Sequence, residues 1–248
     1  MLQISTKPTS PLSISTATTT SGANAQHAAI PSHTFSINWE NVLMPSAWLA
    51  ARMGVDASAQ SLQNAQRLLA QTPQLKTLMA AIEENVIQLL TQAMATGCVY
   101  IFSDRTVQYV ELSCSVFFPR LTACLRSVTR GVFVVGIPDT SFTAEELAEW
   151  KVNILRTVCH ERIFAGQDLA KAHLDRVSRR FGLVALCASD LDVSASDGLA
   201  KLTPLAVTKC VKVAQQATSL EDFAAQVRKL ARFVTEALAF NGPIRIAL

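Results

Sequence analysis

Four short segments carry side chains suited to acid–base or anion chemistry. Residues 38–41 are Asn-Trp-Glu-Asn and follow a short apolar stretch, and residues 103–105 are Ser-Asp-Arg and follow the apolar run 98–102. Residues 188–190 are Ala-Ser-Asp and follow another apolar run. In an open α/β sheet, ligands bind in the loops just past the carboxyl ends of the strands. These segments are therefore the first candidates for a functional site.

A fourth candidate, Lys151, belongs to the helix with the strongest start signal in the chain. Thr143 and Glu146 have the spacing of a capping box, and Phe142 and Leu147 have the spacing of a hydrophobic staple. A lysine held on such a helix can neutralise the charge of a bound phosphate. The competing interpretation is a surface lysine on a packed helix.

The order of these segments resembles the motifs of the haloacid dehalogenase-like (HAD-like) hydrolases. The first motif of one HAD-like subgroup has the pattern aspartate-Trp-aspartate-aspartate-Thr-Leu-Leu-Pro-Ser-x-Trp-Leu. The flanking residues of that pattern match this sequence at Leu43, Pro45, Ser46, Trp48 and Leu49. The resemblance extends from residue 34 to the C-terminus and is carried by the order and spacing of the strand-end motifs.

The resemblance gives five positions a family-equivalent role. Asn38 stands at the nucleophile position, and Glu40 stands at the general acid position. Ser103 occupies the place of the hydroxyl residue that holds the phosphate, and Lys151 occupies the place of the third-motif lysine. Ala188 replaces the metal-binding aspartate of the fourth motif.

Two of these replacements, Asn38 and Ala188, remove groups that the family uses for nucleophilic attack and for binding Mg²⁺. Covalent catalysis by a carboxylate needs an anionic oxygen, and Asn38 offers a neutral amide. Mg²⁺, which bridges the first and fourth motifs in the family, prefers hard anionic oxygens, and neither Asn38 nor Ala188 supplies one. A gap of one residue would bring Asp190 to the fourth-motif position instead. Loss of a hydrolase nucleophile typically costs on the order of a million-fold in turnover.

We therefore predict a pseudophosphatase: a catalytically inactive HAD-like protein, without a cofactor, that acts as a binding or scaffold protein for a protein partner. One alternative is an active Mg²⁺-dependent phosphomonoester hydrolase with an atypical site that uses Glu40 or Asp104 as its acid. Another is a non-catalytic binder of phosphate or phosphoproteins, in which Ser103 and Lys151 hold the anion.

The pattern of apolar runs predicts an α/β fold independently of the resemblance. Short apolar runs alternate with helical patterns, which favours a Rossmann-like parallel sheet with helices on both faces; the cap is expected to be small or absent. The expected strands are residues 34–37, 98–102, 131–137, 182–187, an edge strand at 205–213, and 244–248. The expected helices are residues 42–53, 57–71, a long helix from Pro73 to Gly97, the helix of Lys151, and a final helix capped by Ser219.

Composition separates a tail, residues 1–33, from one α/β domain, residues 34–248. The tail contains twelve Ser or Thr residues and no acid, which predicts disorder. A net charge of +3 does not favour nucleic acid as a partner, and no apolar run is long enough to cross a membrane. Six separated cysteines indicate buried free thiols rather than zinc, in a cytoplasmic protein. Mitochondrial import is the rival localisation, although the tail has no arginine.

Overall fold

A computed structural model describes residues 33–126, 131–138, 142–164, 181–202, 206–213, 217–240 and 242–248. The predicted tail lies outside these residues except for His33, which begins the first strand. Among the described residues, no helix has the length and apolar character needed to cross a membrane.

The core of the fold is a six-stranded sheet in which every neighbouring pair of strands is parallel. Its strand order is β3-β2-β1-β4-β5-β6. The strands are β1 (His33–Asn38), β2 (Gly97–Ser103), β3 (Val132–Gly136), β4 (Phe181–Cys187), β5 (Ala206–Lys212) and β6 (Ile244–Ala247). The predicted Rossmann-like α/β class is confirmed. The chain leaves β1 first toward β2 and β3 and later toward β4, β5 and β6, so the strand order reverses beside β1.

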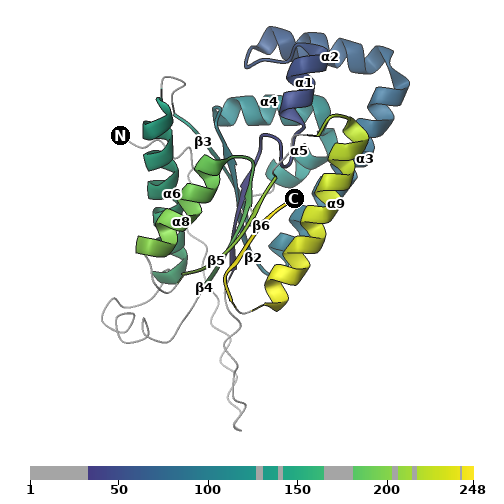
Figure 1. The fold of residues 1–248 in the computed structure, drawn as a ribbon. Helices are drawn as coiled ribbons and strands as arrows, with labels where there is room; N and C mark the ends of the chain where they lie inside the picture. The colour runs from purple at the N-terminus through teal and green to yellow at the C-terminus, as the bar shows by residue number, and fades with distance from the viewer. Residues whose placement is uncertain are drawn as a thin grey trace, which may run out of the picture.

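Helices cover both faces of the sheet, as predicted (Figure 1). The described helices are α1 (Ser46–Met53), α2 (Ala59–Gln71), α3 (Pro73–Met94), α4 (Val107–Phe117), α5 (Pro119–Arg126), α6 (Ala144–Phe164), α8 (Asp190–Leu202) and α9 (Leu220–Ala239). The larger apolar core lies where α3 and α9 pack on the sheet, and it includes Phe35, Ile82 and Val227. A smaller core lies under α6 and α8 and includes Phe102 and Ile154.

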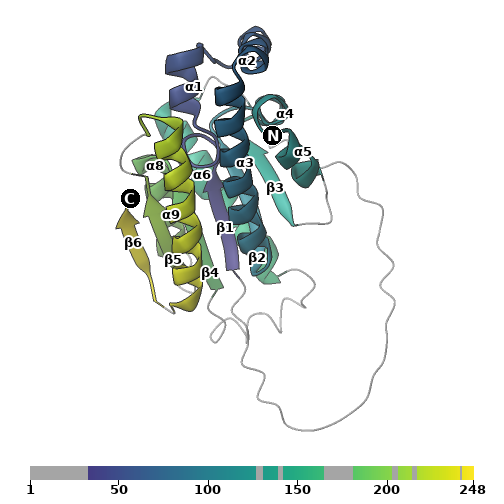
Figure 2. The same cartoon turned by 90° about the vertical axis from the view of Figure 1, so that its right-hand side faces the viewer.

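The helices α1 and α2 follow β1 and lie beyond the carboxyl ends of the strands (Figures 1 and 2). The predicted helix 42–53 begins later than expected, at Ser46. Residues 41–43 form a turn instead, and Asn41 there has a φ of 59°, in the left-handed region that Asn tolerates better than most residues. Pro45 then precedes the helix, where its missing N–H is not needed.

One predicted strand has a different position in the sheet. Residues 205–213 were expected at an edge because apolar and polar residues alternate over part of that stretch. In the structure β5 pairs with β4 on one side and with β6 on the other, so the expectation of an edge strand is wrong. One polar residue of this stretch, Lys209, is buried, and its Nζ donates to the carbonyl oxygen of Ala237 in the last turn of α9, at 2.5 Å.

The capping predictions are confirmed. The backbone N–H of Thr143 donates to Glu146 Oε2 at 2.8 Å, and the N–H of Glu146 donates to Thr143 Oγ1 at 3.2 Å, so the capping box before α6 is complete. The Ser219 hydroxyl accepts from the N–H of Asp222 at the start of α9. These local signals mark the start of α6, the helix that carries Lys151, and the start of α9.

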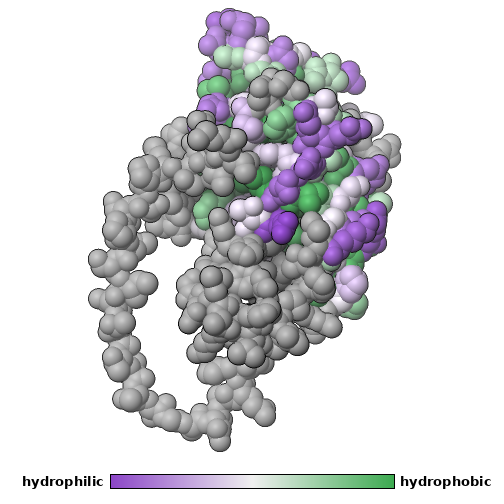
Figure 3. All heavy atoms as spheres, turned by 90° about the vertical axis from the view of Figure 1, so that its left-hand side faces the viewer, coloured by the Kyte–Doolittle hydropathy of each residue, from purple (hydrophilic) through white to green (hydrophobic). Residues whose placement is uncertain are grey.

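Figure 3 shows the side of the molecule on which α6 and α8 lie. On the described part of this face, hydrophilic side chains are interspersed with apolar ones. The described part of this side therefore presents a mixed surface.

Candidate functional site

The candidate site lies at the carboxyl ends of β1, β2 and β4, where the strand order reverses. Asn38 is the last residue of β1 and Ser103 is the last residue of β2, and the two strands are adjacent. Ala188 directly follows β4, the neighbour of β1 on its other side. Ligands of open α/β sheets bind in the crevice at this point of the topology. The structure thus places the ends of these three strands, where Asn38, Ser103 and Ala188 lie, at the same edge of the sheet.

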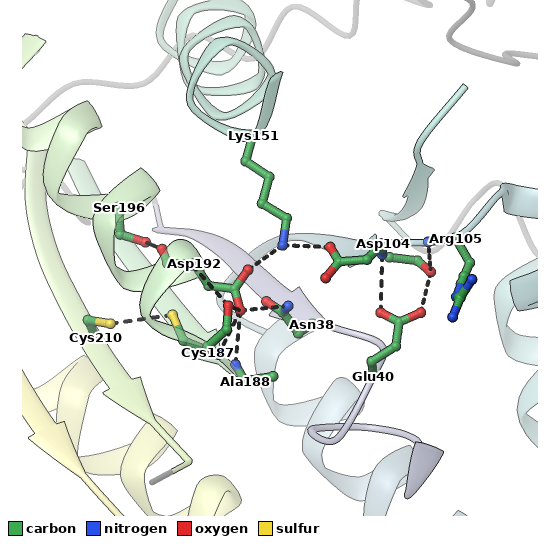
Figure 4. Close-up of polar contacts among 12 residues, drawn as sticks. Asn38, Glu40, Asp104, Arg105, Lys151, Cys187, Ala188, Asp192, Ser196 and Cys210 are labelled. Atoms are coloured by element: carbon green, nitrogen blue, oxygen red, sulfur yellow. Dashed lines mark hydrogen bonds and ion pairs between the residues drawn. The ribbon is translucent and has the colours of Figure 1, made fainter. Parts of the chain in front are cut away.

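A chain of polar contacts crosses this edge of the sheet from α8 to the loop after β2 (Figure 4). Asn38 Nδ2 donates to Asp192 Oδ2 at 2.9 Å, and Lys151 Nζ donates to Asp192 Oδ1 at 2.5 Å. Lys151 Nζ also lies 2.6 Å from Asp104 Oδ1. The side chains of Lys151 and Asp192 are only 4% and 5% exposed, so this ion pair is shielded from water.

Asp192 is the centre of this network, and local sequence places it there. Ser189 caps α8, and Asp192 stands three residues later, where its carboxylate can turn back to the start of the helix. Asp192 Oδ2 accepts from the backbone N–H groups of Ala188 and Ser189, at 3.1 and 2.9 Å, and from Ser189 Oγ at 2.8 Å. Together with Asn38 and Lys151, these donors engage both carboxylate oxygens.

The two buried ions stabilise each other's charged forms. Burial opposes ionisation of Asp192, but the charge of Lys151 and the hydrogen bonds from Lys151, Ser189 and Asn38 outweigh it and lower the pKa of Asp192. Burial also favours the neutral form of Lys151, and the charges of Asp192 and Asp104 outweigh it, so the pKa of Lys151 is raised. The ammonium is therefore held between two carboxylates.

Glu40 forms a second cluster on the β2 side of the site. Ser103 Oγ donates to Glu40 Oε1 at 2.5 Å, and the backbone N–H of Asp104 donates to Glu40 Oε2 at 3.2 Å. The Ser103 oxygen in turn accepts from the N–H of Arg105 at 3.1 Å. Burial raises the pKa of Glu40, and the hydrogen bond from Ser103 only partly offsets it. The Ser103 hydroxyl is thus already engaged by a carboxylate of the same chain.

Two further residues of the segment after β1, Asn41 and Val42, support the loop. Asn41 Oδ1 accepts from the backbone N–H of Ala47 in the first turn of α1, at 2.8 Å, and the backbone carbonyl oxygen of Asn41 accepts from Gln226 Nε2 of α9. Val42 is completely buried in the larger core. In place of the acid and the Thr of the HAD-like motif, this chain has residues with packing and capping roles.

The structure therefore brings Asn38, Glu40, Ser103, Lys151 and Ala188 to one edge of the sheet. The alternative fourth-motif residue, Asp190, lies apart, because its side chain is 87% exposed and contacts Lys212 Nζ at 2.7 Å. Sequence reasoning missed Asp192. The signal for it was present in the spacing of Ser189 and Asp192, which is that of a helix cap with an acid at its third residue.

A pair of thiols lies on β4 and β5, next to the network. Cys187 Sγ and Cys210 Sγ are 3.4 Å apart on neighbouring strands, and both residues are buried. The contact with Cys210, followed by burial, raises the pKa of Cys187. Cys114 is buried as well, and Cys98 is partly exposed, so the predicted burial is confirmed for three of the four cysteines whose surroundings the structure describes.

The residues at the site do not fit the Mg²⁺ ion that the HAD-like resemblance implies. Asn38 directs its NH₂ group, a donor, at Asp192, and the Lys151 ammonium occupies the other oxygen of that carboxylate. A divalent cation at Asp192 would face this ammonium and would have to displace it. Within the described parts of the chain, no group of three or more His, Cys, Asp or Glu side chains is placed to hold a metal ion.

Comparisons with protein-family models, with curated protein sequences and with solved structures found no match for this chain. The HAD-like resemblance thus depends on the motifs and stays a prediction. The architecture and the contacts at the strand ends are independent of it.

Proposed function

We propose that this chain is a non-catalytic HAD-like protein, a pseudophosphatase that acts by binding or scaffolding a protein partner. The observation that carries the proposal is the contact of Asn38 with Asp192. The residue at the nucleophile position is an amide, and its NH₂ group is committed to a buried carboxylate. An amide in this position has no anionic oxygen with which to attack a phosphoryl group.

The charges around Asn38 also argue against phosphoryl transfer. Catalysis of this reaction depends on cationic groups that stabilise the charge on the transferred group. Lys151 lies between the carboxylates of Asp104 and Asp192, at 2.6 and 2.5 Å, so its charge is already compensated. These three side chains together carry a net negative charge, which would repel a phosphate.

The same contacts weigh against the two alternatives. A phosphate held by Ser103 and Lys151 would have to displace Glu40 from the Ser103 hydroxyl and both carboxylates from the ammonium. An active hydrolase with Glu40 as its acid would still lack a nucleophile at residue 38. Glu40 does have a raised pKa, as a general acid needs, and that is the one observation in favour of this alternative.

A phosphatase assay tests the proposal. The full chain is incubated with p-nitrophenyl phosphate in the presence of Mg²⁺ and, separately, of EDTA. We expect the same background rate under both conditions and for the Asn38→Ala variant. Turnover that requires Mg²⁺ and disappears in Asn38→Ala would refute the proposal, and Mg²⁺-dependent turnover lost only in Glu40→Gln would establish the atypical hydrolase.

A thermal-shift measurement with inorganic phosphate separates the pseudophosphatase from the anion binder, because a ligand stabilises only the state that it binds. We expect no increase in Tm with phosphate. An increase that is absent in Lys151→Ala would favour the phosphate binder. Sulfate and chloride at equal ionic strength are the controls for a general salt effect.

A further inference from the structure

The strand β6 forms one edge of the sheet, and Figure 2 shows no described element on its outer side. Its inner side pairs with β5, and the backbone N–H of Leu248 donates to the carbonyl oxygen of Lys212 at 2.9 Å. In a parallel ladder, alternate residues of a strand point their N–H and C=O groups to the same neighbour. Ile246 therefore faces β5 as Leu248 does, and the backbone groups of Arg245 and Ala247 point outward.

This edge is also apolar. Phe240, Ile246 and Leu248 are 53%, 40% and 37% exposed, and they are three of the six large hydrophobic side chains that are exposed in the described part of the chain. Phe240 lies beside the start of β6, because a Cβ atom added to Gly242 would lie 2.8 Å from its ring. An exposed apolar edge strand is a template for another strand.

We propose that β6 pairs with β6 of a second copy of this chain, antiparallel, about a two-fold axis through Ile246. In this register Arg245 lies opposite Ala247 of the second copy. Each such pair exchanges both of its outward backbone hydrogen bonds, which an antiparallel ladder requires. Ile246 then lies opposite its own equivalent, in the closer type of pair that has no hydrogen bonds.

The side chains make this register self-complementary, as a two-fold interface must be. Ile246 meets Ile246, and Ile244 meets Leu248 of the second copy, so apolar side chains face each other on one side of the sheet. On the other side, Arg245 meets the neutral Ala247. The guanidinium of Arg245 is held by Asp197 of its own chain, Nη1 to Oδ2 at 2.8 Å, so equal charges do not oppose each other. The proposal is independent of the function proposed above.

Sedimentation of the full chain tests the dimer. The expected mass is twice the 26.8 kDa of one chain. Ile246→Glu and Ile246→Lys should each sediment as a single chain, because the axis puts two equal charges directly opposite each other. An equimolar mixture of the two variants should recover the double mass. Leu112 is also an exposed apolar residue, on α4, and the matched variants Leu112→Glu and Leu112→Lys should remain dimers.

A second variant decides the test if the Ile246 variants do not fold. Ala247→Pro removes an outward N–H group and leaves the ladder with β5 in place. It should keep the circular dichroism spectrum of the parent and sediment as a single chain. A parent that sediments as a monomer at 100 μM, or an Ala247→Pro variant that folds and remains a dimer, would overturn the proposal. If Ile246→Glu and Ile246→Lys both fold but do not form a dimer when they are mixed, the proposed register is wrong.

Discussion

The two halves of the strand-end site deal with buried charge in different ways. On the β4 side, Asp192 and Lys151 are both nearly inaccessible, and each is ionised more readily because of the other. On the β2 side, the donors to the Glu40 carboxylate among the described residues are neutral, namely the Ser103 hydroxyl and the Asp104 N–H, and burial raises the pKa of Glu40. The cation beside Asp192 therefore outweighs burial and lowers the pKa of that carboxyl group, whereas the neutral hydrogen bonds to Glu40 only partly offset burial.

The contributions of the two halves to stability therefore depend on pH in opposite directions. The stabilisation by Asp192 is present above its unfolded pKa and is lost as pH falls through its lowered folded pKa. The contribution of Glu40 to stability changes with pH in the opposite direction. Its raised pKa means that the folded state holds the proton more tightly, so its relative stabilisation is present below the unfolded pKa of 4.5 and is lost as pH rises through the folded value.

The largest effect is expected for Lys151→Met. The substitution leaves Asp104 and Asp192 without their shared cation, and breaking a buried ion pair in this way typically costs about 3–5 kcal/mol. Urea unfolding at pH 7 measures the loss. Lys212→Met is the matched control, because its partner Asp190 is 87% exposed, and it should lose at most about 1 kcal/mol. If Lys151→Met and Lys212→Met lose the same free energy of unfolding, the buried ion pair of the β4 half contributes no more than an exposed one.

Asn38→Asp should cost about 2 kcal/mol at pH 7, because it replaces a donor to Asp192 with a second carboxylate. The proximity of two carboxylates raises the pKa of the pair, so the cost should decrease as the pH is lowered and one proton is shared. Urea unfolding of the parent and the variant between pH 7 and 5 gives this difference. A cost that does not change with pH would indicate that residue 38 and Asp192 do not interact in solution.

Glu40→Gln should change the free energy of unfolding by a smaller amount that depends on pH. The expected size is on the order of 1 kcal/mol, the contribution of one hydrogen bond. The free energy of unfolding of the parent falls as the pH rises through the raised pKa of Glu40, because the folded state opposes ionisation of this carboxyl group. Gln does not titrate, so the variant lacks this decrease. The variant should therefore gain stability relative to the parent as the pH rises from 4 to 7, as measured by unfolding at each pH. A constant difference over this range would mean that Glu40 ionises in the folded protein as it does in the unfolded one.

Asp190→Asn should have the smallest effect, within about 0.5 kcal/mol, because its ion pair with Lys212 is exposed to solvent. Asp192→Asn, by contrast, removes the charge that accompanies Lys151 and should cost at least about 2 kcal/mol. The comparison of these two neighbouring acids in the same unfolding assay separates their roles. A larger loss for Asp190→Asn would assign the fourth-motif position to Asp190.

Local patterns in the amino-acid sequence predict the strands and most of the helices, and they place the candidate residues at the ends of the strands. The apolar runs before Asn38, Ser103 and Ala188 are buried strands, and their ends meet at one edge because parallel strands all end on the same side of the sheet. The caps at Thr143 and Ser219 were also visible, since the residues involved are only three positions apart. Periodicity and caps are local in the chain, and a single sequence records them.

The cap formed by Ser189 and Asp192 is local, but the packing of distant elements sets which partners the carboxylate of Asp192 meets. Asp190 and Asp192 are two residues apart on the same helix turn, and the choice between them depends on Asn38 and Lys151, which are 154 and 41 residues away from Asp192. The position of β5 inside the sheet also depends on a distant element, because β6 pairs with the edge of β5 that the sequence pattern predicted to be free. Contacts over such separations arise from the packing of whole elements, so local periodicity carries no record of them.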